Sequence, residues 1–406
     1  MKLKDFLINL LLTFSSIYIP FFFLNVFFYS RENSINKNNQ ELQIGRLEED
    51  INERKEALRS GYLPFYYPHS VKKYSTEISV YPVGGLPNTK TYLCNEGYGL
   101  IKYTSDRFGL RNSEKKWGKV TKQDTIFLIG DSFTHGACVN EKFTISSLVE
   151  KNTNLNTINL GTGSSGPYEY YAVNKSIIDP LIKSSKNDNV VIVIFYDNDN
   201  INYNIQWESY LEEVRPVISI SKTQGGFPTN EYKNKINKII KGNYPTSIEK
   251  VELEIDKHNN LHNSEKDNLS KFLTLYNLRS TLKKEILKYF IYNPNQFPYI
   301  FPISNFTSPS QRVINHLGEI CRKNCYPIIA YIPSRNNIGY SEISNKKYKL
   351  KLEEKALSLG IIFIDGEDVI NRNNNEDYAP EGMHLSLEGY KKFSKLISNE
   401  IENILR

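Results

Sequence analysis

Five short apolar runs alternate with longer amphipathic stretches from about residue 121 to the end of the chain. The runs are TIFLIG (125–130), TINL (157–160), VVIVIFY (190–196), PIIAYI (327–332) and GIIFID (360–365). The amphipathic stretches lie at 141–151, 167–187, 308–324, 342–359 and 386–405. Near-continuous apolar strands alternating with helices are typical of a parallel sheet covered on both faces. The pattern predicts an α/β fold, a doubly wound, flavodoxin-like parallel sheet of about five strands.

The alternation is interrupted between about residues 203 and 306, a segment too long for an unstructured loop in a compact domain. We therefore predict a main domain at 121–406 that carries an inserted subdomain at 203–306. Residues 61–120 are rich in Tyr, Pro and Gly and predict short strands and turns that lead into this domain. Residues 30–60 are highly polar and are interpreted as a stalk.

The first part of the chain predicts a membrane anchor. Residues 6–29 carry no charged side chain, and a run of this length can cross a bilayer core of ~30 Å. No A-x-A-like cleavage site follows, so the interpretation is an uncleaved single-pass transmembrane helix. Lys2 and Lys4 before the span are balanced by Arg31 and Lys37 after it, so charge does not decide the topology. The very short amino-terminal tail favours a cytoplasmic amino terminus, with the remainder of the chain outside the cytoplasm.

The overall charge argues against a nucleic-acid partner. The formal net charge is +6, and it is spread without the dense basic block that nucleic-acid binding requires. Four cysteines, at 94, 138, 321 and 325, permit disulfides in an oxidising compartment. Nothing in the sequence indicates the oligomeric state.

Four blocks that could carry chemistry come just after predicted strands or in the last loop of the sheet. They are GDSFTHG (130–136), NLGTGSSGP (159–167), FYDNDN (195–200) and PEGMHLSLEGY (380–390). Open α/β sheets bind ligands at the carboxyl ends of their strands. We therefore expect one site that brings together Ser132, Gly163, Ser164, Asn198 and His384.

The four ordered blocks resemble those of the SGNH or GDSL hydrolases. The stretches CNEGYG, SDRFGLRN and GDSFTHGACV also look like those of membrane-anchored bacterial members, which are often associated with cell-surface polysaccharide. The resemblance implies Ser132 as nucleophile and His384 as base. It also implies Glu381 as the acid three residues before the histidine, where the family usually has Asp. No metal or organic cofactor is implied.

The resemblance further implies an oxyanion hole. Its candidate donors are the backbone N–H of Ser132, a backbone N–H of Gly163 or Ser164, and the side-chain amide of Asn198. The family usually has glycine where Ser164 falls, which leaves Gly163 as the alternative equivalent. The expected activity is that of a serine esterase or O-acyltransferase that works through an acyl-enzyme.

The expected substrates are O-acyl groups, O-acetyl above all, on an envelope glycan. Water and a sugar hydroxyl remain equally open as acceptors, so hydrolysis and transfer are not distinguished. Two alternatives are kept: a lipase or thioesterase acting on lipid esters near the membrane, and a catalytically silent glycan-binding module. The exchange of the usual Asp for Glu381 is the feature that favours the silent module.

Several other residues have structural interpretations. We expect His135 to pack locally, Asp131 to hold its turn by hydrogen bonds, and Asp197 and Asp199 to be hydrogen-bonded structural groups. His258 and His262 have helical metal-pair spacing but lack further ligands, so a solvated face is expected.

The cysteines divide into two pairs. Cys321 and Cys325 are interpreted as two separate helix positions. Cys94 and Cys138 flank the family-like motifs, and a disulfide between them is a hypothesis.

Overall fold

The fold was analysed in a computed structural model that describes part of the chain. The described residues are 50–67, 83–200, 308–322, 324–335 and 340–406, with short pieces at 223–224, 227–228 and 234. Almost all of them belong to one compact unit, Arg54–Thr246 with Ile303–Arg406. The predicted anchor, most of the predicted stalk and nearly all of the predicted insertion lie outside the described residues. Within the described residues, no helix combines the length and apolar character needed to span a membrane.

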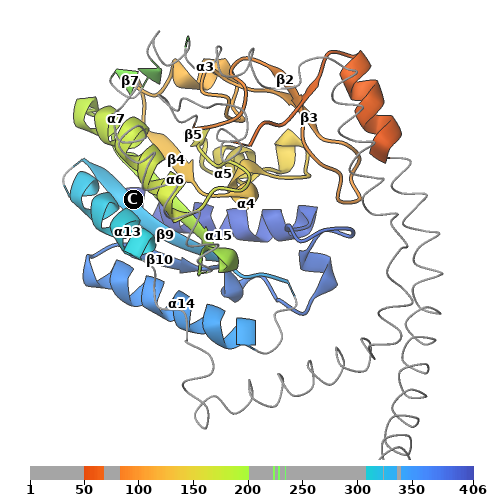
Figure 1. Cartoon of the computed structure of the whole chain (residues 1–406). Coiled ribbons are helices and arrows are strands. Elements are labelled where there is room, and N and C mark those ends of the chain that lie inside the picture. The colour runs from red at the N-terminus through yellow and green to blue at the C-terminus, as the bar shows by residue number, and fades with distance from the viewer. Residues whose placement is uncertain are drawn as a thin grey trace, which may run out of the picture. The chain divides into compact units, whose positions relative to one another are not determined.

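The central sheet contains five parallel strands in the order β10-β9-β6-β4-β5 (Figure 1). Numbered along the chain and read from β5, this order is 2-1-3-4-5, which is the flavodoxin-like order. The predicted doubly wound sheet is therefore confirmed. The strands are β4 (Thr125–Ile129), β5 (Asn156–Asn159), β6 (Asn189–Tyr196), β9 (Cys325–Ile332) and β10 (Ile362–Asp365).

Helices cover both faces of this sheet (Figure 1), because successive strand side chains point to opposite sides. Phe127, with its equivalents on β6 and β9, packs into a core shared with α6, α7, α13 and α14. Leu128, with its equivalents, packs into a second core shared with α5 and α15. The helices are α5 (Ile145–Thr153), α6 (Pro167–Val173), α7 (Asp179–Ser184), α13 (Ser308–Cys321), α14 (Tyr340–Ser358) and α15 (Leu387–Leu405).

The segment before β4 forms a small second sheet and then α3. This sheet pairs β1 in parallel with β2, and β2 antiparallel to β3. Side chains of this segment, among them Phe108 and Trp117, belong to the same hydrophobic core as Phe127 of β4. The elements are β1 (Leu63–Pro64), β2 (Lys90–Tyr92), β3 (Lys102–Thr104) and α3 (Glu114–Trp117).

The SDRFGLRN stretch is organised by the buried carboxylate of Asp106. One oxygen accepts the backbone N–H groups of Phe108 and Leu110 at 2.8 and 2.9 Å. The other accepts the side-chain amide of Asn112 at 2.9 Å and the indole N–H of Trp117 at 2.7 Å. Burial raises the pKa of Asp106 to about 6, so at neutral pH the carboxylate is ionised and can accept all four bonds.

Arg111, from the same stretch, fixes the chain just after the β4–α4 turn. Its guanidinium is buried and donates to the carbonyl oxygens of Gly136 at 2.7 Å and Val139 at 2.9 Å. Its Nε atom also donates to Glu141 at 2.8 Å. The segment before β4 therefore positions the loops at the carboxyl edge of the sheet.

Candidate active site

Ser132 begins α4 (Ser132–His135), a single turn that follows β4 directly. The carboxylate of Asp131 caps this turn by accepting the backbone N–H of Phe133 at 2.9 Å, as predicted. Gly130 is required at the end of β4, because a Cβ atom there would lie 2.1 Å from Oγ1 of Thr134. The turn ends at Gly136, whose φ of 78° is in the left-handed region that favours glycine. The sequence GDSFTHG thus builds a tight strand-to-helix turn at the carboxyl edge of the sheet.

His384 lies in hydrogen-bond contact with Ser132. Its Nε2 atom is 2.9 Å from the Ser132 Oγ atom, although 252 positions separate the two residues. The imidazole packs against Phe133, with the ring centroids 4.8 Å apart. Phe133 in turn stacks on Tyr196 at the end of β6, with centroids 4.2 Å apart. The two residues predicted as nucleophile and base are therefore brought together.

The loop that carries His384 is braced on both sides. The backbone N–H of Ala379 donates to the carbonyl oxygen of His384 at 2.8 Å. Arg335 donates to the carbonyl oxygens of Ala379 and Gly382 at 3.0 and 3.1 Å. Ser386 then caps α15 by accepting the backbone N–H of Gly389 at 2.9 Å. Arg335 is a bracing residue that sequence reasoning missed, since no motif marks it.

The carboxylate beside His384 belongs to Glu96, which corrects the prediction for Glu381. Oε1 of Glu96 is 2.7 Å from Nδ1 of His384, and Oε2 accepts the backbone N–H of His384 at 3.3 Å. The side chain of Glu381 is exposed. Its backbone N–H donates to the carbonyl oxygen of Glu96 at 3.3 Å. The carboxylate that contacts His384 therefore comes from the lead-in segment, whereas the exposed side chain of Glu381 has its Cγ atom 3.4 Å from the position of a Cβ atom at Gly97.

A disulfide joins Cys94 to Cys138 and confirms that hypothesis. It links the segment carrying Glu96 to the segment that follows α4. The sulfur of Cys138 lies 4.0 Å from Nδ1 of His384. Within the described residues, the one grouping of possible metal ligands is Glu96, Cys138 and His384. Because the cysteine sulfur is in a disulfide, this grouping offers only a carboxylate and an imidazole.

Cys321 and Cys325 are also joined, so their interpretation as separate helix positions is wrong. Cys321 ends α13 and Cys325 begins β9. The chain leaves the helix between them, and their Cα atoms come within 4.5 Å. This second disulfide lies at the amino end of β9, whereas Ser132 follows the carboxyl end of β4.

The predicted oxyanion donors follow β5 and β6. Ser164 has a φ of 60°, which explains why its position favours glycine. The ring of Tyr67 would approach a Cβ atom at Gly163 to 2.9 Å, so Gly163 is also constrained. Within the described residues, neither backbone N–H donates a hydrogen bond; Gly163 is buried and Ser164 is exposed. Asn198 lies in the turn η4 (Asp197–Asn200) after β6, and its side chain is outside the described part of the chain.

The other acidic residues of this region have structural partners, as predicted. Asp199 accepts the backbone N–H of Tyr196 at 2.9 Å and the hydroxyl of Tyr170 at 3.2 Å. Asp197 accepts the backbone N–H and hydroxyl of Ser334 at 2.8 and 2.6 Å. Asp197 also pairs with Arg372. His258 and His262 lie outside the described residues.

His135 packs locally, as predicted. Its side chain is buried, and Nε2 lies 2.9 Å from the hydroxyl of Tyr103. Burial is the main cause that lowers the pKa of His135 to about 3, with the positive charge of Arg111 adding to it. His135 is therefore neutral at every physiological pH.

Acid should destabilise the fold through His135. The unfolded histidine has a pKa of about 6.5, so its contribution to stability is complete above that pH and is lost as the pH falls toward about 3. Between pH 7.5 and pH 5 we expect the parent protein to lose about 2 kcal/mol more than His135→Gln. Urea denaturation of both proteins at the two pH values measures this difference. Equal losses in the two proteins would contradict it.

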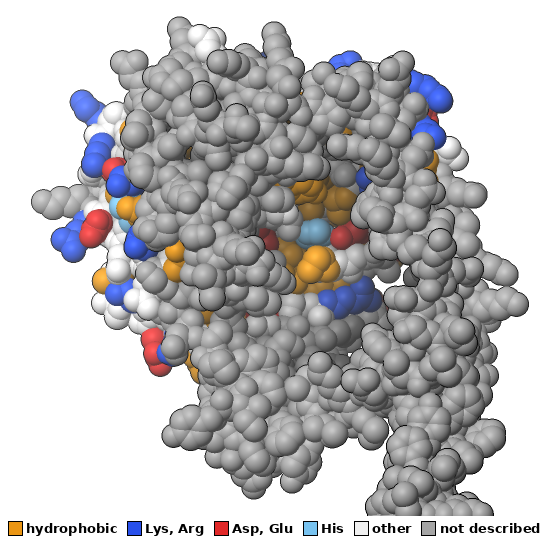
Figure 2. Space-filling model, viewed as in Figure 1, with side chains coloured by type: hydrophobic (Ala, Val, Ile, Leu, Met, Phe, Trp, Pro, Cys, Tyr) orange, Lys and Arg blue, Asp and Glu red, His pale blue; other side chains and the backbone are white. Residues whose placement is uncertain are grey.

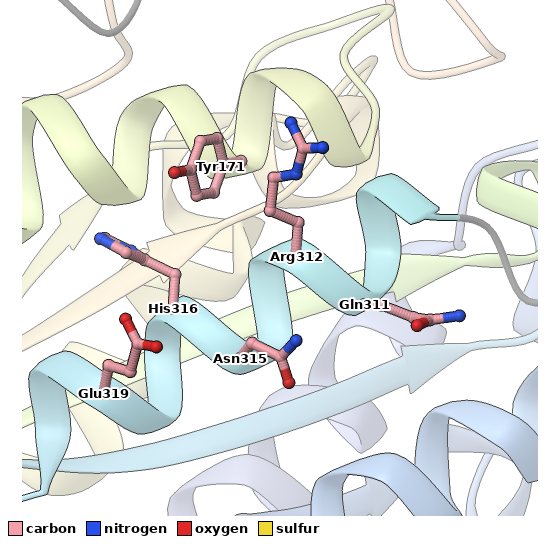
Figure 3. Close-up of a pocket in the computed structure, with 6 residues that line it drawn as sticks. All are labelled: Tyr171, Gln311, Arg312, Asn315, His316 and Glu319. Carbon is pink, nitrogen blue, oxygen red and sulfur yellow. The ribbon is translucent and has the colours of Figure 1, made fainter.

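Figure 2 shows a histidine side chain near the middle of the face, flanked by acidic and hydrophobic side chains. A separate cavity of about 300 Å³ lies between α6 and α13 (Figure 3) and does not include Ser132 or His384. Its lining residues are Tyr171, Gln311, Arg312, Asn315, His316 and Glu319.

Comparison with known proteins gives no sequence relative. No protein-family model matches the chain, and no curated protein matches it. Three solved structures illustrate the structural matches. A G-D-S-L family protein from Desulfitobacterium hafniense DCB-2 is 15% identical with a TM-score of 0.32, covering 68% of this chain and 98% of its own. Est24, a carbohydrate acetylesterase from Sinorhizobium meliloti, is 9% identical with a TM-score of 0.36, covering 69% and 99%.

The third structure, an aryl esterase from M. smegmatis, is 10% identical with a TM-score of 0.32, covering 69% and 99%. At these scores the likeness carries no weight for the function, which is argued from the contacts described above.

Proposed function

We propose that this protein is a serine esterase or O-acyltransferase that works through an acyl-enzyme on Ser132. The observation that carries the proposal is the 2.9 Å contact between Ser132 Oγ and His384 Nε2. A hydroxyl paired with an imidazole at this distance is the arrangement that activates serine as a nucleophile. The site also lies at the carboxyl edge of the sheet beside β4 and β6, where the strand order reverses and such folds bind ligands.

The reaction proceeds in two halves. Ser132 Oγ attacks the ester carbonyl carbon while Nε2 of His384 takes the hydroxyl proton. The tetrahedral intermediate collapses, His384 gives the proton to the leaving alcohol, and the acyl group remains on Ser132. Water or a sugar hydroxyl then attacks the acyl carbon, with His384 again accepting the proton. Collapse of the second intermediate returns this proton to Ser132 and releases an acid or a new ester.

The negative oxygen of each intermediate needs fixed donors. The backbone N–H groups of Gly163 and Ser164, free of internal partners within the described residues, suit this role, beside the N–H of Ser132 and the amide of Asn198. One such donor is worth about 3 kcal/mol of transition-state stabilisation. We assign no single donor to Gly163 or Ser164, because both N–H groups are available.

The proposed substrate is an O-acetyl group on an envelope polysaccharide. The motifs resemble those of membrane-anchored bacterial hydrolases, and the run at 6–29 has the length of an anchor. The two disulfides fit an oxidising compartment and therefore an extracytoplasmic domain. A lipase or thioesterase acting on membrane lipids is the alternative enzyme, and a silent glycan-binding module is the alternative outside catalysis.

A comparison of acyl chain lengths tests the substrate class. We expect the full chain, purified in mild detergent, to hydrolyse p-nitrophenyl acetate at least tenfold faster than p-nitrophenyl octanoate, measured as kcat/KM. The reason is that a site for acetyl groups has no apolar space for six further methylenes, and each mismatched methylene changes the rate by about tenfold or more. Soluble acetylated sugars should compete, and addition of unacetylated sugar should reveal transfer as a new ester. Preference for octanoate would instead favour the lipase.

A second measurement addresses the silent module. A fluorophosphonate should label the parent protein covalently at Ser132, since labelling needs only an activated serine. If a folded parent protein showed neither turnover nor labelling, the esterase would be rejected. Binding of an acetylated glycan that survived Ser132→Ala would then favour the module.

A further inference from the structure

The carboxylate that contacts His384 holds both the ring and the backbone of that residue. Oε1 of Glu96 is 2.7 Å from Nδ1, and Oε2 accepts the backbone N–H of His384 at 3.3 Å. The side chains of Glu96 and His384 are each 12% exposed, so the contact is shielded from water. A shielded carboxylate at Nδ1 holds the ring proton there and leaves the Nε2 lone pair free for Ser132.

The closing loop is shaped to admit this carboxylate. A Cβ atom at Gly382 would lie 1.8 Å from the carboxyl carbon of Glu96 and 2.2 Å from each oxygen, so a side chain there would displace this carboxylate from its present position. A Cβ atom at Gly97 would lie 3.2 Å from the ring of Pro380. The φ of Gly97 is 96°, a backbone conformation that favours glycine. The Glu96 loop and the His384 loop are therefore fitted to each other at two glycines.

The Glu96 loop is also held from its own side. The side-chain oxygen of Asn95 accepts three successive backbone N–H groups, from Gly97, Tyr98 and Gly99, at 2.8, 3.2 and 3.1 Å. Cys94, two positions before Glu96, is bonded to Cys138 just beyond α4. The loop is thus tied covalently to the segment that carries Ser132.

We infer that Glu96, supplied by the lead-in segment, is the residue that positions His384, and that the Cys94–Cys138 disulfide keeps it in place. The inference deepens the proposed function and rests on it. Glu96 acts through the imidazole: it holds the ring proton on Nδ1 and stabilises the imidazolium that forms when Ser132 is deprotonated. The carboxylate at Nδ1 is that of Glu96, and not that of Glu381 three residues before the histidine.

The variant Glu96→Gln tests this role most sharply. The backbone N–H of His384 needs an acceptor, so the carbonyl oxygen of the glutamine takes the place of Oε2 and its NH₂ group faces Nδ1. The imidazole must then carry its proton on Nε2, where it cannot accept one from Ser132. We expect kcat/KM to fall by 10²- to 10⁴-fold with little change in the thermal midpoint. The matched control Glu381→Gln should stay within twofold of the parent.

Glu96→Ala separates positioning from packing. A purely structural role predicts that alanine, which leaves a gap, is worse than the isosteric glutamine. Positioning predicts that glutamine is as poor as alanine or poorer in activity, and that Glu96→Asp recovers part of the rate. If Glu96→Gln stayed within threefold of the parent while Ser132→Ala abolished turnover, the inference would be overturned and the proposed function would stand.

The ring tautomer gives a readout that does not depend on turnover. In protein labelled with ¹⁵N at histidine, the His384 resonances, assigned by their loss in His384→Gln, should report a proton on Nδ1 in the parent and on Nε2 in Glu96→Gln. The same tautomer in both proteins would overturn the inference. A changed tautomer in a protein without esterase activity would support the inference while rejecting the proposed function.

The contribution of the disulfide is tested with the second disulfide as control. Cys94→Ser with Cys138→Ser should lower kcat/KM by about tenfold or more, whereas Cys321→Ser with Cys325→Ser should leave it within twofold. The first disulfide acts through Glu96. When the two serine substitutions at Cys94 and Cys138 are made in the Glu96→Gln protein, kcat/KM should therefore fall little further. Independent, multiplying losses would reject the coupling between the disulfide and Glu96.

Discussion

Replacement of Ser132 with alanine should lower kcat/KM for p-nitrophenyl acetate by about 10⁴- to 10⁶-fold. Covalent catalysis ends when Oγ is removed, and what remains comes from the oxyanion donors and substrate binding alone. The fold should persist, because the hydrogen bond that caps α4 comes from Asp131 and not from Ser132. The Oγ atom that is removed contacts Nε2 of His384. Steady-state kinetics and fluorophosphonate labelling measure the loss.

The control for this change is Ser358→Ala, which removes an exposed hydroxyl at the end of α14 and should leave the rate unchanged. Circular dichroism and the thermal midpoint establish that Ser132→Ala is folded. A folded Ser132→Ala protein that kept a tenth of the parent activity would show that another group is the nucleophile. The hydrolysis would then have to be assigned to a different site.

The fold was predictable because each strand of the central sheet coincides with a short apolar run in the sequence. The central strand β6 (Asn189–Tyr196) is buried along its whole length, so no polar residue interrupts the run VVIVIF before its final tyrosine. Ser132 and His384 were predictable for a related reason. Ser132 directly follows a strand, and His384 lies in the last loop of the sheet before the final helix. The carboxyl ends of parallel strands share one edge of the sheet, so the two residues were expected to lie close together.

The source of the acid was not predictable from motif spacing. Glu381 stands three positions before His384, where the resemblance puts an acid, but 288 positions separate Glu96 from the histidine it contacts. Spacing along the chain says nothing about which distant loops will meet. A signal was present in CNEGYG, where Glu96 follows Cys94, and a disulfide to Cys138 would have placed it near Ser132.

The second disulfide was missed for a similar reason. A spacing of four residues suits one helical face, and Cys321 and Cys325 have no Gly or Pro between them to mark a helix end. The observed α13 ends at Cys321, and the chain reverses to enter β9 at Cys325. The spacing of the two cysteines does not show that the helix ends at the first of them and that the strand begins at the second.

Replacement of His384 with alanine should cost nearly as much as loss of the nucleophile, about 10⁴- to 10⁶-fold in kcat/KM. Within the described part of the chain, His384 is the hydrogen-bond partner of Ser132 Oγ, so its loss removes the group that takes the proton. His135 cannot substitute, because it is buried and its Nε2 lies against the hydroxyl of Tyr103. The same kinetic assay measures this effect, and thermal unfolding shows whether loss of the ring contact with Phe133 affects the fold.

His316→Gln is the matched histidine control, since His316 lines the separate cavity on α13 and should leave the rate unchanged. Ser132 and His384 act as one unit, so the double variant should be no slower than either single variant. Losses that multiplied in the double variant would mean that the two side chains act independently, and the proton transfer between them would be rejected. If the double variant instead has the same kcat/KM as the single variants, the two side chains act together in the covalent step.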